Sequence, residues 1–464
     1  MLLRSGRFAW RFPMDPVPRS LAPLLLLLVL ALVSSAWAAT TVVVGSDPSK
    51  TVIKGTLVTP DQVIDGELVI EGDTITCAAA SCPDPPGATR ITVTNAYIFP
   101  GFVDAHNHVA YNVLPRWTPP QLYKNRGQWQ GSDAYKVFKK PYDDLKGKGL
   151  DCEMIKYGEV KALLSGVTTI QGTSPGSQCI RTLIRNAENQ SGLGTSADHI
   201  RTFILDIGSF SGTVNWSATK SFVVHLAEGV RGDPKSLTEF TTLKAKGLLA
   251  SGTAVIHGAA FGDPEFQQMG AAGTKLIWSP RSNLVLYAQT TNIPLALQQG
   301  VEVSLGVDWN PSGSDHIFDE LRTAVEVNEE EFGGAIPDND WVKMITVKPA
   351  KALALEAFIG RLAPGLKADI AVLRSRDADP TKSVLKTHLQ DVQMVWVGGD
   401  LLYANKAILD KIKPGACEPL LVYGSQKKVC VKSTTLQVPK AAQTLEQIRT
   451  ILHSNYPLLA PLTP

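Results

Sequence analysis

The chain has 464 residues, of which 44% are hydrophobic and 19% charged, a balance that is typical of globular proteins and excludes wholesale disorder. Its formal net charge is +2, and residues 1–38 alone carry +3, so the remainder is close to neutral. A near-neutral body gives no electrostatic reason to expect nucleic acid or an anionic membrane as a partner. A small-molecule partner and a homo-oligomer are both compatible with this charge balance.

Residues 1–38 have the composition of a secretory signal peptide. A basic stretch precedes the apolar run Leu21–Val33, and the small residues around Ala38 offer a cleavage site. The alternative is a retained membrane anchor, but the run is shorter than the roughly 20 residues that span a bilayer. We expect a secreted or periplasmic protein that has no membrane contact after cleavage.

Six cysteines remain after that cleavage. An even number in an exported chain favours disulfide bonds, although six cysteines allow fifteen pairings. Pairing of sequence neighbours is the simplest expectation, with Cys77–Cys82 in a Pro-rich loop and Cys417–Cys430 closing a terminal hairpin. The C-x-x-C spacing of cysteine metal sites is absent.

The flanks of the chain are predicted to form strands. Short runs rich in Val, Ile and Thr, separated by Gly, Asp and Pro, are typical of a small sheet domain. We expect residues 39–97 and 359–405 to form the two parts of one β-sandwich, with residues 406–464 as a C-terminal extension. The expected strands are Thr41–Val44, Thr51–Leu57, Val63–Glu71, Thr74–Cys77, Arg90–Val93, Asp369–Leu373 and Val392–Val397.

Residues 98–358 alternate between strand and helix patterns, which indicates an α/β fold with a parallel sheet or a barrel; of these we expect a (β/α)8-type (TIM) barrel. Seven strands are expected: Ile98–Ala105, Val167–Gln171, Ile200–Asp206, Ser221–His225, Ala254–His257, Lys275–Ser279 and Glu302–Gly306. The expected helices are Cys152–Leu164, Ile180–Gln190, Ser236–Ala250, Pro264–Ala271, Ile293–Gln299, Ile317–Glu330 and Asp340–Leu353. A barrel needs eight strands, and too few residues for a helix separate Asp206 from Ser221. We expect a distorted barrel, or one that lacks a regular unit there.

Residues 112–150 follow the first barrel strand and are rich in Trp, Tyr and Pro. Loops at that end of barrel strands build active sites, so this insertion is a candidate lid or substrate wall. A structural packing loop is the alternative.

Four expected strands end in residues that can bind metal. His106 and His108 stand at i and i+2, so their side chains share one face of a strand and can hold one ion. His225, His257 and Asp308 each end another apolar strand. Any one of them is weak evidence, but ligands spread over several strand ends are the pattern of a barrel active site.

Glu228 follows His225 by three residues, just before Gly229. The glycine allows a turn that brings the carboxylate back over the mouth of the barrel, where it could move protons. A surface acid is the alternative.

Together these residues resemble the amidohydrolase superfamily, especially its cytosine/guanine/atrazine-type branch of deaminases and related hydrolases. The resemblance covers residues 66–373. The motifs that carry it are Pro100–His108, His225–Gly229, Ser279–Asn283, Gly306–Trp309, Lys348–Leu355 and Ile359–Leu373.

The resemblance implies one divalent ion, zinc or iron, bound by His106, His108, His225 and Asp308. It implies that His257 hydrogen-bonds water or substrate and that Glu228 shuttles a proton, while Asp308 also orients the attacking hydroxide. Ser279, Arg281, Asn283 and Trp309 would line the substrate pocket. Relatives with two ions use a modified lysine; Lys220 points to the wrong strand end, so one ion is expected.

The implied function is an exported hydrolase of a non-peptide C–N bond, such as a cyclic amide or amidine, through deamination or ring opening. One alternative is a binuclear dipeptidase or lactonase of the same superfamily. Another, from a different class, is a catalytically inactive binding or scaffold protein, although every ligand position is filled.

Overall fold

The computed structural model describes residues 40–172, 183–188, 193–433 and 440–463. The expected signal peptide at 1–38 and Cys179 lie outside these residues. In the described ranges, no helix combines the length and the apolar character that crossing a bilayer requires.

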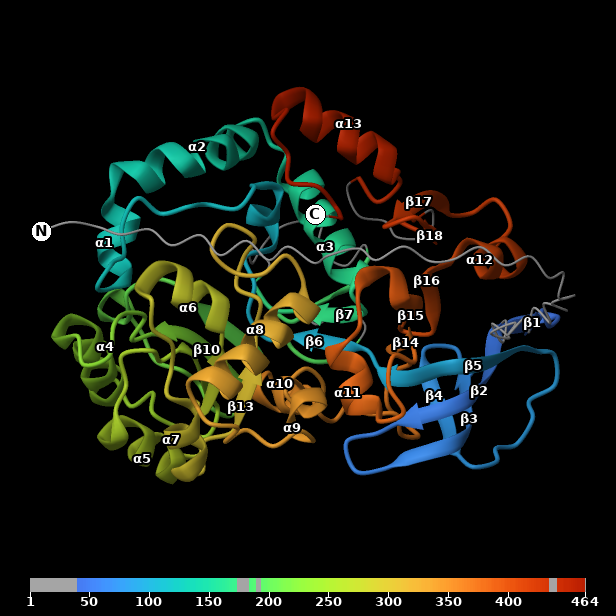
Figure 1. Cartoon of the computed structure of the whole chain (residues 1–464), viewed down its shortest axis with the longest axis horizontal. Coiled ribbons are helices and arrows are strands. Elements are labelled where there is room, and N and C mark those ends of the chain that lie inside the picture. The colour runs from blue at the N-terminus through green and yellow to red at the C-terminus, as the bar shows by residue number, and fades with distance from the viewer. Residues whose placement is uncertain (1–39, 173–182, 189–192, 434–439, 464) are drawn as a thin grey trace, which may run out of the picture. The chain divides into compact units, whose positions relative to one another are not determined.

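The two flanks of the chain build one ten-stranded sheet (Figure 1), in the order β17-β18-β16-β15-β14-β5-β2-β3-β4, with β1 also paired to β5. Because β5 pairs with both β2 and β14, residues far apart in the sequence share one apolar core, and the predicted sandwich-like sheet from both flanks is confirmed. The strands are β1 Thr41–Val43, β2 Asp47–Val58, β3 Val63–Glu71, β4 Thr74–Ala79, β5 Ala88–Pro100, β14 Ile370–Arg374, β15 Val392–Val397, β16 Asp400–Asn405, β17 Glu418–Val422 and β18 Ser425–Val429.

Eight parallel strands form the centre of the described chain. They pair as β8-β7-β6 and as β9-β10-β11-β12-β13, and a bridge between Asn107 and Asp308 joins β6 to β13. This is the strand order of a barrel, as predicted; among the described residues no pairing closes it between β8 and β9. The strands are β6 Phe102–Asp104, β7 Val167–Ile170, β8 Arg185–Asn186, β9 Ile200–Phe203, β10 Ser221–Leu226, β11 Thr253–His257, β12 Lys275–Trp278 and β13 Val303–Leu305.

The expected strand Ile98–Ala105 is two strands in the structure. Ile98–Pro100 ends β5 in the large sheet, and β6 begins the barrel at Phe102. Gly101 joins them against β7, where a Cβ atom would lie 2.2 Å from Thr168 Oγ1. A single hydrophobic run therefore serves two sheets, and the sequence pattern shows no break because both parts are buried.

The expected helix Ile180–Gln190 is wrong at its centre, where Arg185–Asn186 is β8, the eighth strand. Both side chains are held from outside the segment. Arg185 pairs with Asp369 at 2.7 Å, and Asn186 Nδ2 donates to Glu159 Oε1 at 2.9 Å. The remaining expectation holds: between Asp206 and Ser221 the chain forms a 3-10 turn, η2 Ile207–Ser209, and no α-helix.

Helices cover the barrel strands. The motif Ser279–Asn283 enters a helix, in which Pro280 occupies the first turn, where a missing N–H costs nothing. The helices are α3 Asp151–Leu164, α4 Pro234–Ala245, α5 Asp263–Ala272, α6 Pro280–Tyr287, α7 Ile293–Gln298, α8 Ile317–Glu330, α9 Asp340–Lys343, α10 Val347–Ala352 and α11 Pro380–Leu385, with η3 Leu389–Asp391 before β15.

The insertion is folded: it contains η1 Val109–Val113, α1 Arg126–Gly131 and α2 Asp133–Gly147. Its aromatic side chains pack together and onto Leu286, Tyr287 and Trp309. The C-terminal extension supplies α12 Lys406–Ile412, the β17–β18 hairpin and α13 Leu445–Asn455, which packs on α3.

Both expected disulfides that fall within the described chain are present. Cys77 pairs with Cys82 after β4, and Cys417 pairs with Cys430 across the β17–β18 hairpin. Cys152 is also disulfide-bonded.

Candidate metal and catalytic centre

Four predicted metal ligands meet at one end of the barrel. His106 and His108 follow β6, His225 lies on β10 and Asp308 follows β13. His106 Nε2 lies 3.1 Å and His108 Nε2 3.5 Å from Asp308 Oδ1, and the His225 ring is 4.6 Å from that of His106. Because parallel strands end at the same edge, residues up to 202 positions apart become neighbours.

The backbone fixes this meeting point. Asp308 N donates to His106 O at 2.8 Å, and His108 N donates to Asp308 O at 2.6 Å. Asp308 and His257 adopt positive φ angles of 67° and 69°, which is uncommon for residues other than glycine and turns each side chain at its strand end. Gly306 leaves room for His106, whose Cβ would lie 2.6 Å from an added methyl.

The pKa values of the imidazoles in this centre are shifted in different directions. Burial, followed by the charges of neighbouring histidines, lowers the pKa of His225 well below its usual value and that of His108 to about 4. Burial also opposes the charge of His106, but the hydrogen bond and charge of Asp308 raise its pKa. The same contacts outweigh burial at Asp308 and lower its pKa to about 2. An ionised carboxylate and neutral imidazoles are the forms that bind metal.

These residues fit a divalent metal ion. Two sets of three donor atoms lie within 4.8 Å of one another: His106, His225 and His257, and His106, His108 and Asp308. His225 Nδ1 is buried, and within the described chain it has no hydrogen-bond partner. Three imidazoles and a carboxylate are a donor set that zinc and iron both accept.

Amide side chains orient two of the imidazoles. Gln171 donates through Nε2 to Glu188 Oε1 at 2.8 Å, so its Oε1, 3.3 Å from His106 Nδ1, accepts a hydrogen bond from that ring. Asn283 Oδ1 lies 3.1 Å from His257 Nδ1 in the same way. Each ring therefore turns its Nε2 toward the centre. Neither amide was singled out for this role from the sequence; only the structure brings Gln171 and Glu188 beside β6.

Glu228 returns over the mouth of the barrel, as its position before Gly229 suggested. Its Oε2 lies 3.6 Å from His257 Nε2, and its side chain is buried. Burial raises the pKa of Glu228 to about 7 and lowers that of His257 to about 3. The two groups therefore form an acid–base pair beside the metal ligands, in which the histidine is neutral.

Tyr287 and Trp129 belong to this centre although sequence analysis did not single them out. Tyr287 Oη donates to Glu228 Oε1 at 2.8 Å, and Trp129 Nε1 donates to Tyr287 Oη at 2.8 Å. Tyr287 is the last residue of α6 and Trp129 lies in α1. The aromatic composition of the insertion was the one sequence signal for Trp129, and no sequence pattern pointed to Tyr287.

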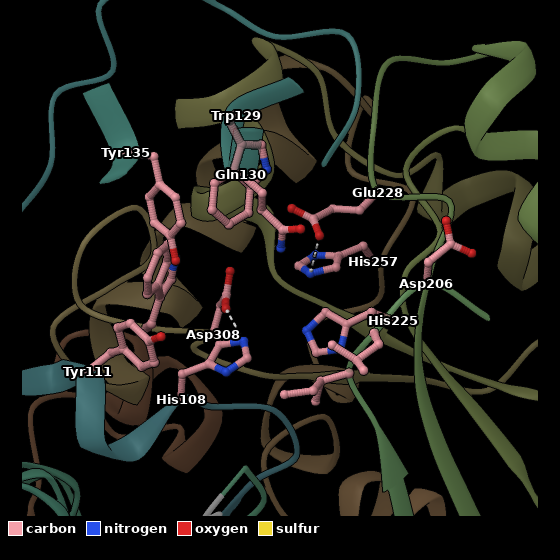
Figure 2. Close-up of a pocket in the computed structure, with 13 residues that line it drawn as sticks. His108, Tyr111, Trp129, Gln130, Tyr135, Asp206, His225, Glu228, His257 and Asp308 are labelled. Atoms are coloured by element: carbon pink, nitrogen blue, oxygen red, sulfur yellow. Dashed lines mark ion pairs between the residues drawn. The ribbon is translucent and has the colours of Figure 1, made fainter. Parts of the chain in front are cut away.

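A cavity of about 200 Å³ opens at the centre, with the imidazoles of His225 and His257 and the carboxylate of Glu228 facing it (Figure 2). Tyr111, Trp129, Tyr135 and Trp309 form an aromatic wall. Among the described residues that line it, none is Lys or Arg. A second cavity of about 240 Å³ shares His108 and His225 with it and also reaches His106; its lining combines apolar residues with the polar side chains of Asn107, Lys146, Gln171, Glu188 and Thr202.

The predicted substrate-binding residues separate into two groups. Trp309 lines the first cavity, whereas Ser279, Arg281 and Asn283 are not among the described residues that line these two cavities, and their role in substrate binding stays a prediction. Helix α6 begins at Pro280, directly after its N-cap Ser279, and carries Arg281 and Asn283. Asn283 acts on His257 instead, and the backbone N–H of Arg281 donates to Glu320 at 3.2 Å.

Lys220 does not reach this centre. Its side chain is exposed and donates to Ser217 O at 2.9 Å. Lys220 is therefore not placed to serve as the modified lysine that lies between two metal ions in some relatives.

Residues 213–402 match the amidohydrolase family. A 5-methylthioadenosine/S-adenosylhomocysteine deaminase from Teredinibacter turnerae is 30% identical over 198 residues, 39% of this chain and 45% of that protein. A protein of the same name from Caldanaerobacter subterraneus is 22% identical over 358 residues, 68% of this chain and 81% of that protein. The chain thus spans less than half the length of the first relative and about four fifths of the second.

Among solved structures, a variant of the atrazine chlorohydrolase from Arthrobacter aurescens TC1, complexed with zinc and atraton, shares the fold with a TM-score of 0.61. It is 16% identical, and the match covers 78% of this chain and 98% of that one. The family match, the relatives and the shared fold agree with the motifs at the strand ends. The chain therefore resembles the amidohydrolase family over residues 213–402, and the relatives it matches are named as deaminases.

Proposed function

We propose that the protein is a metal-dependent hydrolase that removes an amino group from a small heterocycle, breaking a non-peptide C–N bond. The observation that carries this proposal is the convergence of His106, His108, His225 and Asp308 beside the Glu228–His257 pair. The family match supports the class of reaction.

One divalent ion, zinc or iron, would be held by His106, His108, His225 and Asp308. When bound, such an ion supplies Lewis acidity and makes hydroxide available near neutral pH. The position of Lys220, away from the centre, supports one ion. Among the described residues that line the two cavities the only lysine is Lys146, and it is exposed.

Glu228 moves the proton that the reaction requires. A pKa of about 7 makes both its forms accessible near neutral pH, so the carboxylate can accept a proton from water and then give it to the leaving nitrogen. Neutral His257 donates through Nδ1 to Asn283, so its Nε2 accepts a hydrogen bond at the cavity and orients a water or amino group there.

The cavity supports a flat substrate without negative charge. Tyr111, Trp129, Tyr135 and Trp309 offer ring faces and edges for stacking, and the lining has acids but, among described residues, no basic side chain to pair with an anion. The adjoining cavity has room for a hydroxylated substituent. The relatives are named as deaminases of adenosine derivatives, which contain a flat heterocycle.

Metal analysis combined with turnover tests the proposal. The purified protein would be loaded with zinc or iron and offered aminopurine nucleosides, their free bases and 5′-phosphates, aminotriazines, dipeptides and lactones, with ammonia release measured. We expect deamination of uncharged heterocycles and little turnover of the phosphates. Two ions per chain with dipeptide or lactone cleavage would support the binuclear alternative, and loaded protein without any turnover would support the scaffold alternative.

Two variants separate metal binding from proton transfer. His225→Ala should lose metal, whereas Glu228→Ala should keep metal and lose turnover. His453→Ala, at an exposed position on α13, is the matched control and should retain both. Metal retained at the wild-type level in His225→Ala would refute the ligand assignment.

We also propose that the protein is exported after cleavage near Ala38. The composition of residues 1–38 and the two disulfides support this, since structural disulfides persist in oxidising compartments. Fractionation and N-terminal sequencing of the product test it. A mature chain that begins near Ala39 outside the cytoplasm is expected, and an uncut chain in the cytoplasm would refute it.

A further inference from the structure

The two oxygens of Glu228 have different surroundings. Oε1 accepts a hydrogen bond from Tyr287 Oη at 2.8 Å, away from the metal ligands. Oε2 lies 3.6 Å from His257 Nε2, on the side that lines the cavity. Glu228, Tyr287 and Trp129 are only 4%, 2% and 6% exposed, so solvent does not exchange these partners freely.

The direction of this hydrogen-bond chain follows from the donors. The indole N–H of Trp129 can only donate, so Tyr287 Oη accepts it at 2.8 Å. The phenol hydrogen is then directed to Glu228 Oε1, which accepts it. With Oε1 occupied as an acceptor, a proton carried by Glu228 resides on Oε2, beside the cavity.

The insertion holds these hydrogen-bonded residues in place. Its backbone pairs with the Glu228 turn: Arg126 N donates to Glu228 O at 2.9 Å, and Val230 N donates to Lys124 O at 2.8 Å. Gly229 permits this approach, because a Cβ atom there would lie 2.5 Å from Lys124 O. The segment that carries Trp129 is therefore hydrogen-bonded to the Glu228 turn, and Trp129 contacts Glu228 indirectly, through Tyr287.

We propose that Tyr287 is a positioning residue for the proposed proton transfer, held by Trp129 of the insertion, and that it makes Oε2 the only oxygen of Glu228 that takes up and releases the proton. This rests on the proposed role of Glu228. In the forward step, the O–H bond of water breaks and an O–H bond forms at Oε2. That O–H bond then breaks as an N–H bond forms on the leaving nitrogen, and Glu228 returns to its ionised form. Tyr287 keeps its own proton throughout.

This arrangement has a measurable consequence. The hydrogen bond from Tyr287 favours the ionised carboxylate and opposes the rise in the pKa of Glu228 that burial causes. Loss of the hydroxyl should raise the pKa of Glu228 and move the acidic limb of kcat/KM to higher pH, because the reaction starts from ionised Glu228. A role in packing alone would not move this limb.

The test uses the metal-loaded full chain and Tyr287→Phe, which keeps the ring. We expect kcat to fall about tenfold to a hundredfold, with KM and metal content close to wild type, together with the shifted acidic limb. Trp129→Phe should shift the limb in the same direction by less. Tyr423→Phe, at a Tyr that is 53% exposed, is the matched control and should match wild type.

A double variant assigns the effect to Glu228. In a Glu228→Gln background, Tyr287→Phe should cause no further loss of kcat, because the group that Tyr287 positions is gone. If Glu228→Gln is inactive while Tyr287→Phe has wild-type kcat and an unshifted limb, the positioning role is refuted and the proposed function stands. If Glu228→Gln keeps full turnover, the proposed function itself fails. Should Tyr287→Phe fail to fold, an unshifted limb in Trp129→Phe would still overturn the inference.

Discussion

Asp308 Oδ1 lies 3.1 Å from His106 Nε2, although the two residues are 202 positions apart. Gln171 accepts from His106 Nδ1, so in the neutral ring Nε2 presents a lone pair to an ionised carboxylate. Two acceptors at this distance repel unless a positive charge lies near them. A proton on His106 or a metal ion satisfies this requirement, which explains why the raised pKa of His106 and the metal donor set coincide.

Replacing Asp308 with Asn should remove the charge while keeping the size of the side chain. Loss of a residue that only contacts a metal ligand lowers metal affinity roughly 10–100-fold. Because Asp308 is itself a proposed ligand, we expect the zinc affinity of Asp308→Asn to fall by more than this. Competition with a chromophoric chelator measures it. Asp133→Asn, whose side chain is 95% exposed on α2, is the control. Equal affinity in Asp308→Asn and wild type would contradict the ligand role.

Gln171→Leu should weaken metal binding without removing a ligand. The variant loses the acceptor of His106 Nδ1–H and leaves Glu188 Oε1 without its amide donor, so the imidazole is free to turn. We expect about a tenfold to hundredfold loss of zinc affinity. Gln121→Leu, at an exposed position, should bind zinc as wild type does. Unchanged affinity in both variants would show that the His106 ring is oriented by other contacts.

Glu159 should make the protein less stable as pH rises. Burial raises its pKa to about 7 from the ordinary 4.5, against hydrogen bonds from Asn186 and Ile184. The folded state therefore holds a proton that the unfolded state has lost, and stability falls between about pH 4.5 and pH 7. Glu159→Gln removes this dependence, so relative to wild type the variant should gain on the order of 3 kcal/mol between pH 4 and pH 8.

Urea unfolding at pH 5 and pH 8 measures this difference in the free energy of unfolding. Glu329→Gln, at an exposed position on α8, should change equally at both pH values. Parallel curves for Glu159→Gln and wild type would show that the carboxyl is already ionised in the folded protein at pH 5.

Gly101→Ala should destabilise the junction between the sheet and the barrel. A Cβ atom at this position would lie 2.2 Å from Thr168 Oγ1 and 2.4 Å from its Cγ2, and Thr168 is fully buried. Overpacking of this kind costs about 1–3 kcal/mol. Thermal unfolding measures the loss, and Gly131→Ala, where nothing lies within 4 Å of the added methyl, is the control. An unchanged melting temperature for Gly101→Ala would mean that β7 can shift to accommodate the methyl group without loss of stability.

Residues whose role depends on strand position could be predicted. His106, His108, His225, His257 and Asp308 each end a long apolar run, and parallel strands bring such ends together whatever the loop lengths. The structure confirms the barrel order and places His108, His225, His257 and Asp308 at one cavity, with His106 at the adjoining one. Their individual roles in binding metal stay predictions.

Residues whose role depends on side-chain contacts across the fold could not be predicted. Tyr287 reaches Glu228 because α6 ends where α1 docks, and neither residue lies in a pattern that names its partner. Strand β8 has two residues, too few for any periodicity, and contacts to Glu159 and Asp369 hold it. Ser279–Asn283 were assigned to the pocket wall by resemblance, whereas Pro280 starts a helix there.

The pairing of strand β5 with β14 means that one part of the large sheet can form only late in synthesis of the chain. Strand β5 lies in the first quarter of the chain, yet one of its edges pairs with β14, some 270 residues later. Until that later segment leaves the ribosome, the nascent chain carries an unpaired and largely apolar strand edge, the kind of surface on which chains aggregate. Folding intermediates would need a chaperone to protect this edge, and fragments that stop before residue 370 should be insoluble.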